Sequence, residues 1–308
     1  TLKNDITATS NVDINAPVTL STNDIDIIAG GTTDFSSTIN GAQDLTIAGT
    51  GEIKINGVIG GDVGLTGVTI NSSSLLTGKI EIAAIGDSNT VGVTGSTAIG
   101  NTNTNTLTLT GTTYSTNAAT YNAATGENID LTGAATTTFT TSNDNITFGT
   151  ATLEMSNGSH LVVNTNTGTG QINIIGGVMG TSSENVTLTA GTGTVAIGAI
   201  GTGSEIADVS ITSSGDTTLH GDFTGGALTT TGPVIIAENI NIGTGTVTFG
   251  STLHSHTGAQ TITFNNPGAD IDITGAIGMI YILPGIIILI LTARHLSGRS
   301  AVGGFGRI

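Results

Sequence analysis

The sequence contains no cysteine and no tryptophan, and only 9% of its 308 residues are charged. Without cysteine there is no disulfide framework, no thiol nucleophile and no zinc–cysteine or iron–sulfur site. The shortage of charge excludes a coiled coil, which needs charged heptad positions beside its apolar seam. Proline is rare as well, with four residues, and aromatic residues make up 3%. Several common kinds of catalytic and structural site are therefore excluded before any motif is considered.

The charges that are present are divided unevenly along the chain. All 22 carboxylates lie at or before Asp272, and residues 1–275 carry a net charge of −19 because they contain only Lys3, Lys54 and Lys79 as cations. The C-terminal stretch 294–308 contains three arginines and no acid. An acidic body of this kind repels phosphate backbones, so we expect no nucleic-acid partner.

Short apolar pairs at spacing i, i+2 recur along residues 1–275, flanked by Thr, Asn or Gly. Examples are Val12/Ile14, Ile25/Ile27 and Ile172/Ile174. A period of two is the pattern of a strand with one buried face, and no helical i, i+3, i+4 pattern competes with it. The sequence therefore predicts an all-β body.

One phrase of the type Gly-x-Ile-x-Ile recurs, with Val in place of the first Ile in one copy and Ala in place of Gly in another. Copies begin at Gly51, Gly78, Gly170 and Gly193, with another over 269–278, and adjacent copies are spaced roughly 23–27 residues apart. A longer similarity relates 44–72 to 186–213 and indicates a possible internal duplication. Repeats of this length with two or three short strands each favour a solenoid.

These patterns predict a parallel β-helix with coils of about 23–27 residues. Apolar residues would form inward ladders, Thr would face outward, and Gly and Asn would supply the corners. The alternative is a tandem of β-sandwich domains, which would need longer strands and repeats of about 90–100 residues.

The sequence also resembles a known group of proteins. Phrases such as those over 185–201 and 243–250 are similar to filamentous-haemagglutinin-type, β-strand-repeat bacterial surface proteins. That resemblance implies a right-handed parallel β-helix, an extracellular or cell-surface location and an adhesive or structural role. It carries over no individual functional residue.

Paired carboxylates are the first candidates for chemistry. Asp24/Asp26 and Asp270/Asp272 have spacing i, i+2, and the isoleucines between and after them should take the core, so the acids should point outward. A β-helix polysaccharide hydrolase or lyase would need such acids in a groove, one raised pKa and a basic partner. The body offers few cations and only Tyr114 and Tyr121 as sugar-stacking tyrosines, so we expect no enzyme.

Metal sites are the second candidates. His254 and His256 would share one strand face, but a transition metal needs a third ligand. His160 and His220 are expected to be isolated surface residues. Acidic corners at Asp216 and Asp222 would bind Ca²⁺ weakly at most, so the sequence predicts no other cofactor.

The C-terminal region differs in character. Residues 276–293 are uncharged and mostly apolar, long enough to span a bilayer, and 294–308 form a basic Gly/Arg tail. The region is interpreted as a membrane or sorting segment, as a subunit contact or cap, or as an artefact of the sequence. The candidate self-assembly or anchoring residues are Ile286, Ile287, Ile288, Leu289, Ile290, Leu291, Arg294, Arg299 and Arg307.

The sequence as a whole predicts a non-enzymatic, extracellular structural protein: an adhesin or a self-assembling filament subunit of a bacterial surface. Its partners would be further copies of itself, joined head to tail, or surface glycans. The alternative is a β-helix protein that binds or degrades polysaccharide. Acids clustered with a basic partner in one groove would favour that alternative, whereas a plain Thr/Asn surface would favour the structural role.

Overall fold

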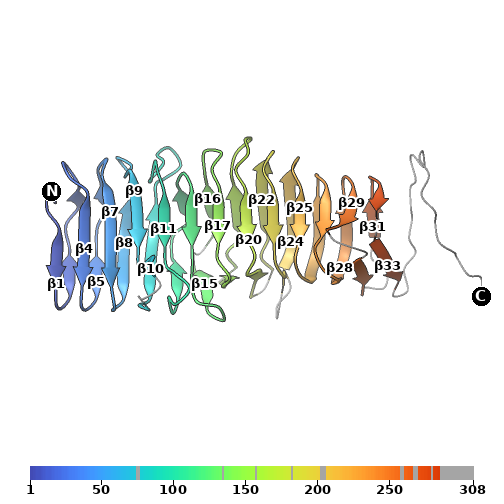
Figure 1. The fold of residues 1–308 in the computed structure, drawn as a ribbon, viewed down its shortest axis with the longest axis horizontal. Helices are drawn as coiled ribbons and strands as arrows, with labels where there is room; N and C mark the ends of the chain where they lie inside the picture. Colours follow the sequence, from blue (N-terminus) through green and yellow to red (C-terminus); the bar gives the residue numbers. More distant parts are fainter. Residues whose placement is uncertain are drawn as a thin grey trace, which may run out of the picture.

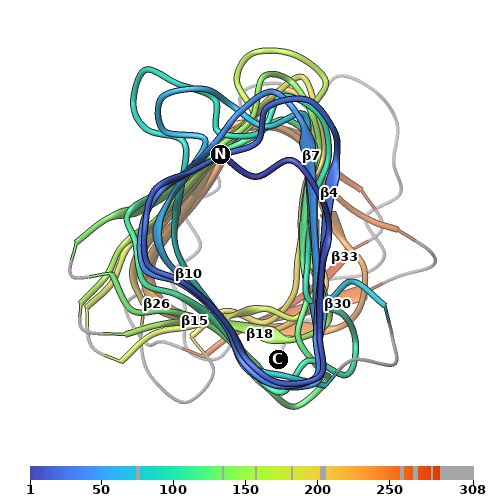
Figure 2. The same cartoon turned by 90° about the vertical axis from the view of Figure 1, so that its left-hand side faces the viewer.

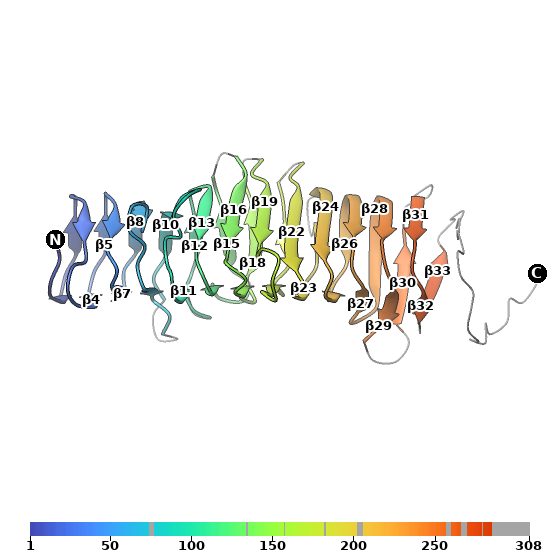
Figure 3. The ribbon, with the colours of Figure 1, turned by 90° about the horizontal axis from the view of Figure 1, so that it is seen from above.

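The computed structural model describes residues 1–73, 77–133, 135–156, 158–181, 183–201, 206–256, 260–265, 270–278 and 280–284. In these residues the chain forms parallel β-strands and no helix, stacked as a β-solenoid of about 11 turns with coils averaging about 23 residues. The predicted parallel β-helix is therefore confirmed, and the β-sandwich alternative is wrong. Figures 1 and 3 show the strands side by side along a rod whose N-terminus lies at one end.

The strands belong to two sheets. The first sheet contains, in stacking order, β1 (Ile6–Ala8), β4 (Ile25–Ala29), β7 (Asp44–Gly49), β9 (Gly67–Ile70), β11 (Thr97–Ile99), β14 (Ala119–Tyr121), β17 (Ile146–Phe148), β20 (Ile172–Ile174), β23 (Val195–Ile197), β25 (Thr217–Leu219), β27 (Val234–Ile236), β29 (Leu253–Ser255) and β32 (Ile277–Gly278).

The second sheet forms the other two walls of the solenoid. Its strands are β2 (Val12–Ile14), β3 (Val18–Thr19), β5 (Thr33–Phe35), β6 (Ile39–Asn40), β8 (Ile53–Ile59), β10 (Ile80–Ile85), β12 (Leu107–Leu109), β13 (Thr113–Ser115), β15 (Asn128–Leu131), β16 (Thr137–Thr140), β18 (Thr152–Met155), β19 (Leu161–Asn164), β21 (Val178–Met179), β22 (Val186–Gly191), β24 (Ile206–Ser213), β26 (Phe223–Thr230), β28 (Ile240–Phe249), β30 (Gln260–Phe264), β31 (Asp270–Ile273) and β33 (Ile280–Pro284).

Long strands join the last two walls at their shared corner. β8 pairs with β5 through its first half and with β6 through its end, and β28 likewise pairs with both β30 and β31. Seen along its axis, the rod therefore has three walls around one core, with loops of unequal size at the corners (Figure 2).

Coil length varies more than the sequence repeats suggested. In the first sheet the shortest coil joins Thr217 to its register partner Val234, and the longest joins Val68 to Thr97. The shortest coil lies below the predicted range of coil lengths and the longest coil lies above it, so the predicted range is too narrow. The lower end of that range nevertheless matches the mean coil length. Loops at the corners take up the difference in coil length, because a strand only has to pair in register with the equivalent strand of the neighbouring coil.

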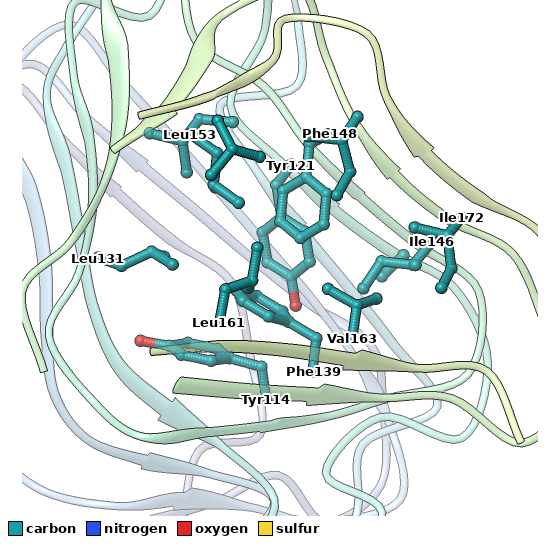
Figure 4. Packing of buried hydrophobic residues seen from close by; sticks show 14 of the residues in the cluster. Tyr114, Tyr121, Leu131, Phe139, Ile146, Phe148, Leu153, Leu161, Val163 and Ile172 are labelled. Carbon is teal, nitrogen blue, oxygen red and sulfur yellow. The ribbon is translucent and has the colours of Figure 1, made fainter. Parts of the chain in front are cut away.

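The core is a continuous column of inward side chains, as the alternation of the strands predicts. Tyr114, Tyr121, Phe139 and Phe148 form an aromatic cluster in the middle coils (Figure 4). Tyr114 stacks on Phe139 with ring centroids 4.9 Å apart, and Phe148 meets Phe139 edge to face at the same distance. Such pairs add to the stabilisation from apolar burial.

Two corner positions show why glycine and asparagine are so frequent. Gly60 has φ +69°, and a Cβ there would meet the backbone oxygen of Gly92 in the next coil. Asn71 also has positive φ and is buried. Its side-chain oxygen accepts a hydrogen bond of 2.9 Å from the Gly49 N–H, and its side-chain nitrogen donates one of 3.0 Å to the Gly49 carbonyl. The left-handed region suits both residue types.

The repeated phrases stack, but the longer similarity does not reflect equivalent placement. Ile53 pairs with Ile80, and Ile172 with Val195, so adjacent copies of the phrase lie in register. In contrast, β7 and β8 of 44–72 lie on the first and second sheets, whereas the corresponding β22 and β23 lie on the second and first. A strand motif of this chain can therefore serve on either sheet.

The described part of the hydrophobic C-terminal segment continues the solenoid. In β32, Ile277 pairs with Leu253, and in β33, Ile280 pairs with Gln260. A search of the described residues found no helix with the length and apolar character needed to cross a membrane.

Candidate functional site on the charged wall

One outward column of side chains on the second sheet carries much of the charge that lies within strands. In-register pairing places Asp13, Asp34, Lys54, Glu81, Thr108, Asp130, Glu154 and Met179 one above another on β2, β5, β8, β10, β12, β15, β18 and β21. We call this set the charged column. Neighbouring members are one strand spacing apart, roughly 4.8 Å.

Lys54 neutralises part of the N-terminal half of the charged column. Its Nζ lies 3.0 Å from Glu81 Oε1. The hydrogen bond from Lys54 to Glu81, and then the charge of that carboxylate, raise the pKa of Lys54 above its ordinary value. Both side chains are partly exposed, so this ion pair adds little to the stability of the fold.

Asp130 and Glu154 lie in register with no cation next to them in the column. Thr108 precedes this pair and Met179 follows it. Asp130 Oδ1 is shielded from solvent and accepts no hydrogen bond, while Glu154 accepts one from the Asn128 amide. Burial, followed by the charge of Glu154, raises the pKa of Asp130.

The equivalent outward column of the first sheet has Asp26 on β4 but is uncharged from β7 onward. It presents Thr46, Thr69, Ala98, Thr120, Thr147, Asn173, Ala196 and Thr218 in register from β7 to β25. The two walls thus differ in their electrostatics: acids gather with a lysine on one, and small polar residues cover the other.

A second group of polar side chains has a structural task that the sequence reasoning missed. In each case the residue lies just before the first inward residue of a strand. Its side chain accepts a hydrogen bond from the backbone N–H of the equivalent residue one coil later. The acceptors are Asp5, Asn11, Asp24, Asn145, Asn185, Asp222 and Asn239 through Oδ1, and His160 through Nδ1, at 2.7–3.1 Å. These corner caps satisfy N–H groups at the point where the chain turns into the strand.

The carboxylate pairs singled out in the sequence point outward, as expected. Asp24, Asp26, Asp270 and Asp272 are exposed, and the isoleucines that alternate with them are buried. Asp24 is a corner cap for the N–H of Asp44, not merely a solvated acid. The in-register pairs of the charged column lie a whole coil apart in the sequence, so a search for i, i+2 pairs does not find them.

The candidate metal ligands weighed from the sequence are spread over several coils of the solenoid. His254 and His256 lie on one face of the chain at β29, and nothing adds a third ligand: the part of the chain that the structure describes holds no group of three His, Asp or Glu placed for a metal. The Asp222 carboxylate accepts hydrogen bonds from both the backbone N–H and the side-chain amide of Asn241. His160, expected to be an isolated surface residue, is half-buried and caps Asn185.

The predicted self-assembly segment, residues 286–291 with Arg294, Arg299 and Arg307, lies outside the described residues. The two tyrosines considered for sugar stacking, Tyr114 and Tyr121, are fully buried in the core. They cannot form an exposed aromatic platform.

Comparison of the chain with protein-family models, curated proteins and solved structures found no match.

Proposed function

We propose that this chain is a non-enzymatic structural protein of a bacterial cell surface, an extracellular β-solenoid rod that acts as an adhesin or as a self-assembling filament subunit. The observation that supports this proposal is the unbroken parallel ladder from β1 to β32. At roughly 4.8 Å for each of about 11 coils, the rod is about 53 Å long.

Charge and surface composition agree with this role. A net charge of −19 over residues 1–275 makes bodies repel one another side by side, which favours single rods or end-to-end contacts over lateral clumping. The basic tail 294–308 has the opposite charge and supplies a complementary partner for the acidic body of another copy. A head-to-tail contact of this kind repeats without closing.

Negative-stain electron microscopy tests the filament role. We would compare the full chain, a chain ending at Pro284, and a full-length variant with Arg294, Arg299 and Arg307 replaced by Glu. We expect filaments from the full chain alone, and their loss at high salt. Single rods from all three proteins would contradict self-assembly, and binding of labelled rods to a glycan array would then test the adhesin role.

The charged column favours one alternative, a polysaccharide-binding or polysaccharide-degrading wall. It provides clustered acids, a lysine and one raised carboxyl pKa, as such a site requires. Against it, Lys54 pairs with Glu81 and is three strands from Asp130, and Tyr114 and Tyr121 are buried. Reducing-end assays on acidic and neutral polysaccharides would decide, with Asp130→Asn as the control.

A further inference from the structure

Asp130 and Glu154 are held together by the backbone, not by attraction between opposite charges. β15 and β18 pair in register over four residues, from Asn128 with Thr152 to Leu131 with Met155. Leu131 and Met155 are buried, so a register slip would expose the core. The two carboxyl groups consequently project from adjacent strands, where like charges are destabilising.

The neighbours in the column do not supply a positive charge. On β12 the neighbour is Thr108, on β21 it is Met179, and Glu127, just before β15, adds a third carboxylate. Further along the column, Glu81 on β10 is paired with Lys54. The Asn128 amide does donate to the pair, but its acceptor is Glu154.

The buried oxygen of Asp130 therefore poses a definite problem. Oδ1 is shielded from water and has no donor, and leaving such a group unsatisfied is costly. Two ionised carboxylates can only accept hydrogen bonds, whereas a protonated carboxyl group can also donate one. A single proton held between Asp130 and Glu154 would lower the free-energy cost of leaving the shielded oxygen without a hydrogen bond. The same proton would remove the charge repulsion between the two carboxylates.

We propose that Asp130 and Glu154 form a carboxyl–carboxylate pair that shares one proton and stabilises the middle coils of the rod in acid. The pair would act as a pH-sensitive element in the fold. This inference does not depend on whether the rod is an adhesin or a filament subunit.

The direction of the effect follows from the raised pKa of Asp130. When the folded-state pKa lies above that of the unfolded chain, the fold binds the proton more tightly. Its contribution is complete below the unfolded value, near 3.8, and is lost as the pH rises through the higher folded value. The middle of the rod should therefore become less stable as the pH rises through that window.

The test compares Asp130→Asn with Asp34→Asn in the full chain. Asp34 is a matched control because it lies in the same column and loses the same charge, and Asn at this position still accepts from the Asn56 amide. We would titrate the Asp130 carboxyl by NMR and measure urea midpoints from about pH 4 to about pH 8. We expect Asp130 to titrate above its ordinary value. Asp130→Asn should gain stability over wild type at the alkaline end only, and Asp34→Asn should show no such gain.

Two results would overturn the proposal. One is an ordinary titration of Asp130, which wild-type protein alone can reveal even if a variant does not fold. The other is a stabilisation of wild type by about 5 mM CaCl₂ near pH 8 that Asp130→Asn lacks, because a cation, not a proton, would then neutralise the pair.

Discussion

Thr217 offers the sharpest test of how this core is stabilised. The residue is fully buried in the first sheet, between Val195 and Val234 in the inward ladder, and its hydroxyl has no hydrogen-bond partner. A buried, unsatisfied polar group costs about 1–3 kcal/mol. Replacing Oγ1 with a methyl group of similar size removes that cost and adds apolar contact with two valines. Thr217→Val should therefore stabilise the rod by about 1–2 kcal/mol.

Thr137 provides the matched control, because it is equally buried but its hydroxyl lies 3.1 Å from Ser159 Oγ. Thr137→Val loses that hydrogen bond and should destabilise by about 0.5–1.5 kcal/mol. Urea midpoints give the comparison if the slope is unchanged. Because solenoids can unfold by parts, exchange of the Thr217 amide, which donates to Pro233, provides a local measurement. A Thr217→Val variant no more stable than wild type would refute the reasoning.

Three further outcomes are expected. Asp24→Ala should cost about 1 kcal/mol in urea unfolding because a corner N–H loses its acceptor, whereas Asp24→Asn should be nearly silent; equal losses would contradict the capping role. His160→Asn should keep the stability that His160→Ala loses, since an amide oxygen replaces Nδ1 as acceptor. Deleting 172–194, one complete coil between the register partners Ile172 and Val195, should give a folded, shorter rod by circular dichroism and small-angle scattering. Deleting only 172–181 should not, because it removes β20 and β21 but leaves β22 without its coil.

The sequence predicts the fold well because its main determinant is local. Each i, i+2 apolar pair specifies a short strand with one buried face, and pairs such as Ile53/Ile55 and Ile80/Ile82 stack as their spacing indicates. Positive-φ corners at Gly60 and Asn71 agree with the expected use of Gly and Asn. What the strand pattern leaves open is the wall on which a strand lies, because strands of similar sequence occur on both sheets.

The candidate site is hidden in the sequence for the same reason. The coil that separates Lys54 from Glu81 is longer than the coil that separates Asp130 from Glu154, so no fixed period aligns the charged column. Because the corner loops differ in length, the residues of the charged column are unevenly spaced in the sequence. The backbone hydrogen bonds between strands nevertheless place them in register in space. A signal was nevertheless present for the corner caps, since Asp, Asn or His160 stands directly before the first inward residue of its strand. In a solenoid, polar residues at that position are best assigned to the backbone first, and only the acids that remain, such as Asp130 and Glu154, are candidates for function.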